Sequence, residues 1–173
     1  MSVVDELLAA NAAFVETFSP QPSPVPSRRL AIATCMDARI DVFAALGLEL
    51  GDAHVIRNAG AVVTRDLVRS LVVSQHRLQT REILVMGHTG CGMEGLDEDA
   101  MADELAAATG ARPALALGGF ADVAESVARS VELIRATPFL PYRDAVRGAV
   151  YEVETGRVRE VDTGHCDSGV TPA

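Results

Sequence analysis

The stretches Leu30–Arg39, LAIATCMDAR, and Ile83–Gly92, ILVMGHTGCG, decide the fold predicted for this chain. Each begins with a short uncharged apolar run and ends in residues able to do chemistry. Short apolar runs of this kind are typical of strands buried on both faces of a parallel sheet. Ligands of such sheets bind beyond the carboxyl ends of the strands, where the strand order reverses. We therefore expect Cys35 and His88 to meet in one crevice.

The rest of the chain alternates apolar runs with helical patterns. A further buried strand is expected at His54–Arg57, and two strands at Ala149–Glu154 and Arg157–Val161 form a hairpin or an edge extension. The alternation predicts an α/β fold with a mostly parallel central sheet, flanked by helices on both faces. The helices are expected at residues 41–46, 64–78, 100–109 and 121–136.

The two ends differ from the middle, although residues 1–173 read as a single domain. Apolar residues recur at helical spacing up to Phe18, and Ser2 with Asp5 suits a helix start. Residues 19–29, SPQPSPVPSRR, hold four of the eight prolines and predict an extended connector. Residues 1–29 thus form a helix on an arm, which packs either on its own domain or on a partner subunit. Residues 162–173 are polar and are expected to form a loose tail.

The composition excludes several classes of protein. There are 15 Lys+Arg against 24 Asp+Glu, a net charge of −9, and every basic residue is Arg. This acidic balance argues against nucleic-acid binding, which needs a basic surface. Hydrophobic residues make up 49% of the chain, enough for a full core, yet no uncharged run is long enough to span a membrane. We expect a cytoplasmic protein without a secretory signal.

The chain has only three cysteines, an odd number, which does not suit a disulfide framework. We therefore expect free thiols or metal ligands. Cys35, His88 and Cys91 form a donor set that suits Zn²⁺, and three protein ligands leave the fourth position that a catalytic zinc needs. Asp37 is the nearest further oxygen donor. A Cys–His hydrolase is the other reading of these residues, but it leaves the second cysteine without a role.

Three ordered motifs resemble the β-class carbonic anhydrases, in particular the short actinobacterial type. The motifs are Cys35-x-Asp37-x-Arg39, Arg57-Asn58-Ala59-Gly60 and His88-x-x-Cys91-Gly92. The chain departs from the family's pattern in having Ala38 where Ser is common. It also lacks Trp, so the bicarbonate pocket of some bacterial members is not expected.

The resemblance implies reversible hydration of CO₂ to bicarbonate by zinc-hydroxide attack, with Zn²⁺ bound by Cys35, His88 and Cys91. Asp37 and Arg39 would form a dyad that orients the hydroxide, and the N–H of Gly92 would donate to the substrate. In some members the aspartate leaves the arginine and binds zinc at lower pH. Activity that rises from neutral to alkaline pH is therefore expected. The family also implies a homodimer or homotetramer that packs through the sheet edge and the N-terminal helix.

Two alternatives remain open from the sequence. The same zinc site could hydrolyse COS or CS₂, or Asp37 could close a non-catalytic zinc site permanently. The other polar candidates are interpreted as structural or solvated: His54 on a strand, His76 on a helix face, Arg57 and Asn58 at a strand end, and His165 with Cys166 in the tail.

Overall fold

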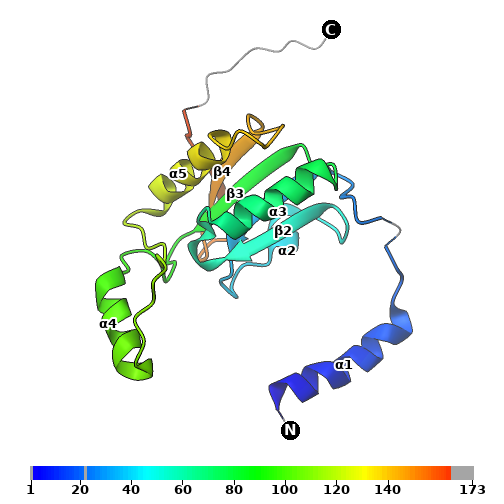
Figure 1. Cartoon of the computed structure of the whole chain (residues 1–173). Coiled ribbons are helices and arrows are strands. Elements are labelled where there is room, and N and C mark those ends of the chain that lie inside the picture. The colour runs from blue at the N-terminus through cyan, green and yellow to red at the C-terminus, as the bar shows by residue number, and fades with distance from the viewer. Residues whose placement is uncertain (1, 22, 165–173) are drawn as a thin grey trace.

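The computed structural model describes residues 2–21 and 23–164. Helices and strands alternate along most of the chain, as the sequence predicts (Figure 1). The elements are α1 Val3–Thr17, β1 Leu30–Cys35, α2 Val42–Leu46, β2 Ala53–Asn58, a 3₁₀ turn at Ala59–Ala61, α3 Arg65–His76, β3 Glu82–His88, α4 Glu98–Thr109, α5 Val123–Arg135, β4 Val146–Tyr151 and β5 Val158–Val161.

The five strands form one sheet in the order β2-β1-β3-β4-β5. The first four are parallel and β5 runs antiparallel to β4, which confirms the mostly parallel sheet and the terminal hairpin. From β1 the chain passes to β2 on one side and then to β3 on the other. The strand order therefore reverses at the carboxyl ends of β1 and β3, where Cys35 and His88 stand.

Helices α3 and α5 cover one face of the sheet (Figure 1). Alternate strand residues such as Ala31, Val85 and Val150 are buried against Leu71 of α3 and Val131 of α5. Gly87 in β3 permits this close packing, because a Cβ there would stand 2.8 Å from a methyl of Val123 in α5. The residue next to the metal-ligand candidate His88 is thus seated tightly under α5.

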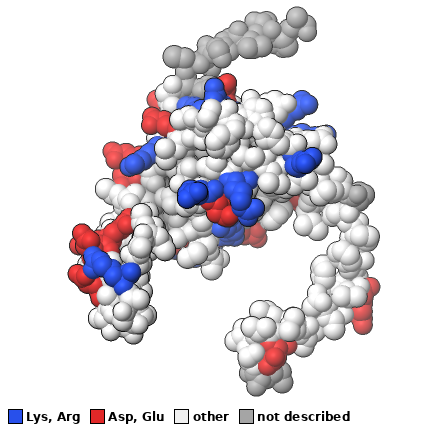
Figure 2. All heavy atoms as spheres, in the orientation of Figure 1, with Lys and Arg blue, Asp and Glu red and all other residues white. Residues whose placement is uncertain are grey.

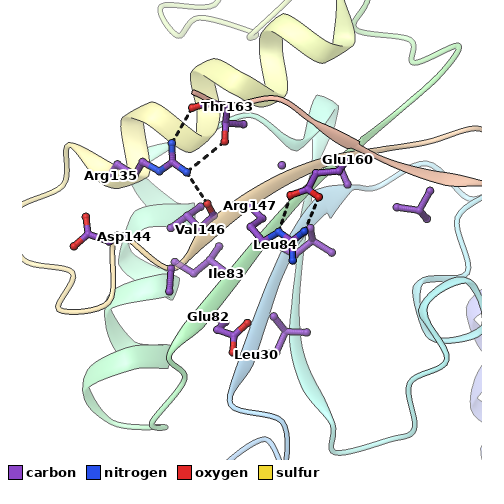
Figure 3. A pocket seen from close by; sticks show the side chains of 14 residues that line it. Leu30, Glu82, Ile83, Leu84, Arg135, Asp144, Val146, Arg147, Glu160 and Thr163 are labelled. Carbon is purple, nitrogen blue, oxygen red and sulfur yellow. Dashed lines mark hydrogen bonds and ion pairs between the residues drawn. The ribbon is translucent and has the colours of Figure 1, made fainter. Parts of the chain in front are cut away.

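The opposite face is covered only in part. Ile32, Met86 and Ala149 are buried there, but Leu30 and Leu84 remain partly exposed. A cavity of about 700 Å³ lies at this open region, near the amino ends of β1 and β3. The ion pair between Arg147 and Glu160 lines it (Figure 3). The expected helical cover is thus complete on one face, while α2 and the loops leave part of the other open. The strand predicted as buried at His54–Arg57 is also only half-buried, because β2 lies at the sheet edge.

The N-terminal helix confirms the prediction for the start of the chain. Ser2 accepts a hydrogen bond from the Asp5 N–H, and the Asp5 carboxylate accepts one from Ser2 N–H in return. Helix α1 has no buried residue and stands away from the body on its arm (Figure 1).

No helix in the described part of the chain is both long and apolar enough to cross a membrane. Most of the predicted loose tail, including His165 and Cys166, lies outside the described residues.

Candidate metal centre

The structure brings Cys35, His88 and Cys91 together, as the sequence predicts. Cys35 ends β1, His88 ends β3, and Cys91 follows in the turn after β3. Their donor atoms all lie within 4.8 Å of one another, and the three residues are buried. The two sulfur atoms are 3.9 Å apart. Two thiolates on a tetrahedral zinc, each at ~2.3 Å, would be separated by about 3.8 Å.

The His88 ring is oriented for a metal ion. Its Nδ1 donates a hydrogen bond to the backbone carbonyl of Thr89 at 2.9 Å, so the proton resides on Nδ1. Its Nε2 is buried and has no hydrogen-bond partner among the described residues. A buried nitrogen of this kind costs free energy unless something binds it. The donor set and this free nitrogen together fit a zinc ion.

The two thiols are buried. Burial raises the pKa of Cys91, and the neighbouring Cys35 adds to the effect. The backbone N–H of Gly60 points at the Cys35 sulfur at 3.4 Å, a contact that supports negative charge on it. Metal binding must therefore displace the proton of Cys91, so its affinity is expected to increase with pH.

Asp37 and Arg39 form a tight pair beside the cluster. Arg39 donates to both carboxylate oxygens, with distances of 2.9 and 2.7 Å, and to the Gly90 carbonyl at 2.9 Å. These hydrogen bonds hold the pKa of Asp37 well below its usual range and raise that of Arg39. Oδ2 of Asp37 lies 3.7 Å from Nε2 of His88. An ionised carboxylate is thus kept next to the metal-ligand candidates by a bidentate partner.

Arg57 confirms the structural role expected for it. Its guanidinium donates to three backbone carbonyls of the Cys35–Ile40 loop, at Cys35, Asp37 and Ile40, over 2.7 to 3.2 Å. Asn58 likewise donates to the Val62 carbonyl at 2.8 Å. The Arg57 contacts fix the loop that carries the dyad, and the Asn58 contact stays within the turn after β2.

Gly92 lies at the exposed side of the cluster, directly after Cys91. A Cβ built on Gly92 meets no atom within 4 Å. There is therefore open space beside Gly92, and the predicted donation from its N–H to a substrate stays a prediction.

The two other histidines of the described residues are His54, which makes structural hydrogen bonds as predicted, and His76, which was predicted to lie on a solvated face. In His54, Nδ1 lies 2.8 Å from the Ser74 hydroxyl and Nε2 lies 3.1 Å from the Pro24 carbonyl, so the ring ties the arm to α3. His76 is exposed, and its Nε2 lies 2.9 Å from the Phe139 carbonyl.

One wall of the site was not found from the sequence. Phe120 and Met93 approach the left-handed turn at Gly60 so closely that a Cβ there would stand 3.0 to 3.2 Å from them. The two segments are joined by a hydrogen bond from the Phe120 N–H to the Met93 carbonyl at 3.1 Å. Glu98 ties together the two ends of the segment between Met93 and Phe120, because its carboxylate accepts hydrogen bonds from the N–H groups of residues 117, 118 and 119. No periodicity in the sequence signals contacts of this kind.

The comparisons with known proteins agree with this geometry. The family model described as carbonic anhydrase matches residues 30–115. Beta-carbonic anhydrase 1 of Mycobacterium tuberculosis is 44% identical over 162 residues, which cover 93% of this chain and 99% of the relative.

Two further relatives extend the comparison. A solved carbonic anhydrase from Streptococcus mutans has a TM-score of 0.88 at 41% identity and covers 94% of this chain and 99% of its own. A carbon disulfide hydrolase of Acidithiobacillus thiooxidans is 35% identical over 77% of each chain. The match to the M. tuberculosis protein is stronger in identity and coverage than the match to the hydrolase. The chain therefore belongs to the β-carbonic anhydrase family.

Proposed function

We propose that the protein catalyses the reversible hydration of CO₂ to bicarbonate at a Zn²⁺ ion held by Cys35, His88 and Cys91. The observation that carries the proposal is the buried Cys-His-Cys cluster with an unpartnered imidazole nitrogen. The names of the M. tuberculosis and S. mutans relatives support it. Ligand thiols must stay reduced, which suits the cytoplasm as the proposed location.

The residues around the cluster have separate roles in this proposal. When bound, zinc lowers the pKa of a water molecule and so supplies a nucleophile near neutral pH. Asp37, as a carboxylate, accepts a hydrogen bond from that nucleophile and orients it. Arg39 keeps Asp37 ionised and away from the metal through its two hydrogen bonds. The Gly92 N–H donates to an oxygen of the substrate from the open side of the site.

The pairing of Asp37 with Arg39 supports an open site over a permanently closed one. A structural zinc site with Asp37 as its fourth ligand would gain nothing from a bidentate arginine beside it. In this structure the arginine also bonds the Gly90 carbonyl, which ties the dyad to the turn that bears Cys91.

Stopped-flow CO₂ hydration on zinc-quantified protein tests the proposal. We expect rapid hydration that increases from neutral to alkaline pH, because the nucleophile ionises over this range while Asp37 is already an anion. COS and CS₂ are assayed in parallel, since one relative is a carbon disulfide hydrolase. Zinc-replete protein that hydrates no CO₂ at any pH would contradict the proposal, and turnover of CS₂ alone would replace it.

We also propose that the protein is a homo-oligomer, a dimer or a tetramer, in which α1 packs on a second copy. One stripe of α1 carries exposed apolar side chains, including Leu7 at 65% and Phe14 at 56% exposure. Seven residues separate these two, which places them on the same side of the helix. The helix carries acidic residues but no basic ones, as the arm in Figure 2 shows. An apolar stripe left in water is typical of an interface.

Light scattering on charge-matched variants tests the oligomer. Leu7→Asp puts a charge on the apolar stripe and is expected to reduce the mass by at least half. Ala9→Asp adds the same charge about 200° further around the helix and is expected to leave the mass unchanged. Equal masses for wild type, Leu7→Asp and Ala9→Asp would contradict a role for α1 in assembly.

A further inference from the structure

Thr89 links the end of β3 to the turn between β4 and β5. Its backbone N–H donates to the Tyr151 carbonyl at 3.0 Å. Its hydroxyl donates to Oε2 of Glu154 at 2.9 Å and accepts from the Val153 N–H at 3.1 Å. The hydroxyl thus donates one hydrogen bond and accepts another, and it is held from two sides.

The same residue orients the imidazole of His88. The backbone carbonyl of Thr89 accepts the hydrogen bond from Nδ1 at 2.9 Å. A carbonyl accepts only, so this bond determines which ring nitrogen is protonated and where the free Nε2 points. The direction of the metal-ligand candidate therefore depends on where the Thr89 backbone is held.

Glu154 connects this support to the other half of the site. A hydrogen bond to a carboxylate is stronger than one between neutral groups, so Glu154 is the firmer of the two hydroxyl partners. Its charge also acts on Arg39, whose pKa is raised mainly by the hydrogen bond to Asp37 and further by Glu154. Glu154 is exposed, whereas the ring that it supports through Thr89 is buried.

We propose that Thr89 and Glu154 are a positioning pair for His88. The carboxylate holds the Thr89 hydroxyl, the hydroxyl holds the backbone, and the Thr89 carbonyl holds the ring with Nε2 toward the two sulfur atoms. Neither residue touches the substrate or the metal. This inference rests on the proposed metal site.

The same turn contains a matched control. The Thr155 hydroxyl donates to Oε2 of Glu152 at 2.8 Å and accepts from the Arg157 N–H at 3.2 Å. This arrangement repeats the pattern at Thr89, yet neither of these hydrogen bonds involves His88. Replacing either threonine by valine removes a hydroxyl that is hydrogen-bonded to this turn, and only Thr89 bears on the imidazole.

The test compares metal binding by folded variants. Zinc affinity is measured by competition with a chromophoric chelator, and Co²⁺ replaces zinc to give an absorption spectrum sensitive to ligand geometry. Thr89→Val is expected to weaken zinc binding about 10- to 100-fold and to shift the cobalt bands. Thr89→Ser restores both values, Glu154→Gln weakens binding less than Thr89→Val, and Thr155→Val stays within about twofold of wild type.

Two results would overturn the inference. Thr89→Val with wild-type zinc affinity and cobalt spectrum would show that the hydroxyl does not position the ring. Equal weakening by Thr155→Val would assign the effect to the stability of the turn. If Thr89→Val does not fold, the zinc affinity of Glu154→Gln is compared with that of Glu152→Gln. Glu154 bonds Thr89 and Glu152 bonds Thr155, so only the first variant is expected to weaken binding. Failure of the wild-type chain to bind one zinc would instead remove the proposed function, and this is measured first.

Discussion

Cys91→Ala is expected to lose its zinc and, with it, at least about three orders of magnitude in kcat/KM for CO₂ hydration. The variant removes one of only three donors in the cluster and leaves Cys35 and His88 to hold the ion alone. Metal catalysis supplies several kcal/mol of transition-state stabilisation, and each ~1.4 kcal/mol is worth tenfold in rate. Zinc per chain after desalting and stopped-flow rates measure the two losses.

Cys166→Ser is the control for this prediction. It removes the third cysteine of the chain, which is not among the three proposed ligands, and we expect one zinc per chain and an unchanged rate. Chelation of the wild-type protein should abolish hydration, and added Zn²⁺ should restore it. A Cys91→Ala protein that keeps stoichiometric zinc and the full rate would contradict the assignment of the ligands.

The convergence of Cys35 with His88 was predictable because it follows from topology. Two uncharged apolar runs predict parallel neighbouring strands, and parallel strands end at the same edge of the sheet. The ends of the strands were less predictable, because the apolar run in the sequence and the hydrogen-bonded ladder of the sheet end at different residues. The apolar run Ile83–Met86 predicts a strand that ends at Met86, but the ladder of β3 continues to His88, which pairs with Tyr151.

The strand β4 shows a second reason why boundaries shift. The apolar pattern places it at Ala149–Glu154, but it spans Val146–Tyr151. Arg147 and Gly148 interrupt the apolar pattern but remain in the strand. The Arg147 side chain bonds Glu160 on the neighbouring strand β5, and Gly148 leaves room for Val127 of α5. Charge on an exposed face and glycine beneath a helix are both compatible with a strand, and neither is visible as periodicity.

The supports of the site could not be derived from spacing. The Thr89–Glu154 hydrogen bond joins residues 65 positions apart, and Glu98 binds backbone groups about twenty positions further along. Such side-chain contacts depend on the tertiary structure alone and leave no repeat in the sequence. Asp37 and Arg39 belong to a local motif and could be singled out as candidates. Thr89, Glu154 and Glu98 have no such motif and could not.

Asp37→Asn is expected to retain zinc and to lose roughly 10²-fold in kcat, the scale of a positioned proton acceptor. The amide keeps the shape of the carboxylate, but its NH₂ group replaces one of the two oxygens that accept from Arg39, so one of these hydrogen bonds is lost. It also lacks the charge that orients the nucleophile. Removing an anion from the site also eases ionisation of the nucleophile. The pH midpoint of the remaining activity should therefore move to lower pH.

The arginine variants separate charge from geometry. Arg39→Lys keeps the positive charge but cannot reproduce the bonds to both Asp37 oxygens and to the Gly90 carbonyl, so we expect a partial loss. Arg39→Ala frees Asp37, which lies 3.7 Å from His88 Nε2, to move onto the metal, and we expect a loss as large as that of Asp37→Asn. Arg69→Ala breaks an exposed arginine–aspartate pair within α3 and is the control.

The order of these rates decides the role of the dyad. The hydrogen bonds from Arg39 lower the folded-state pKa of Asp37, so the pair contributes stability above the unfolded carboxyl pKa of ~3.9 and loses it as the pH falls. Throughout the assay range Asp37 is therefore ionised in the wild type, and differences among the arginine variants report the geometry of the pair. Full activity in Asp37→Asn with zinc bound would exclude Asp37 from the reaction. Equal rates for Arg39→Lys and wild type would show that a positive charge suffices and that the bidentate geometry does not matter.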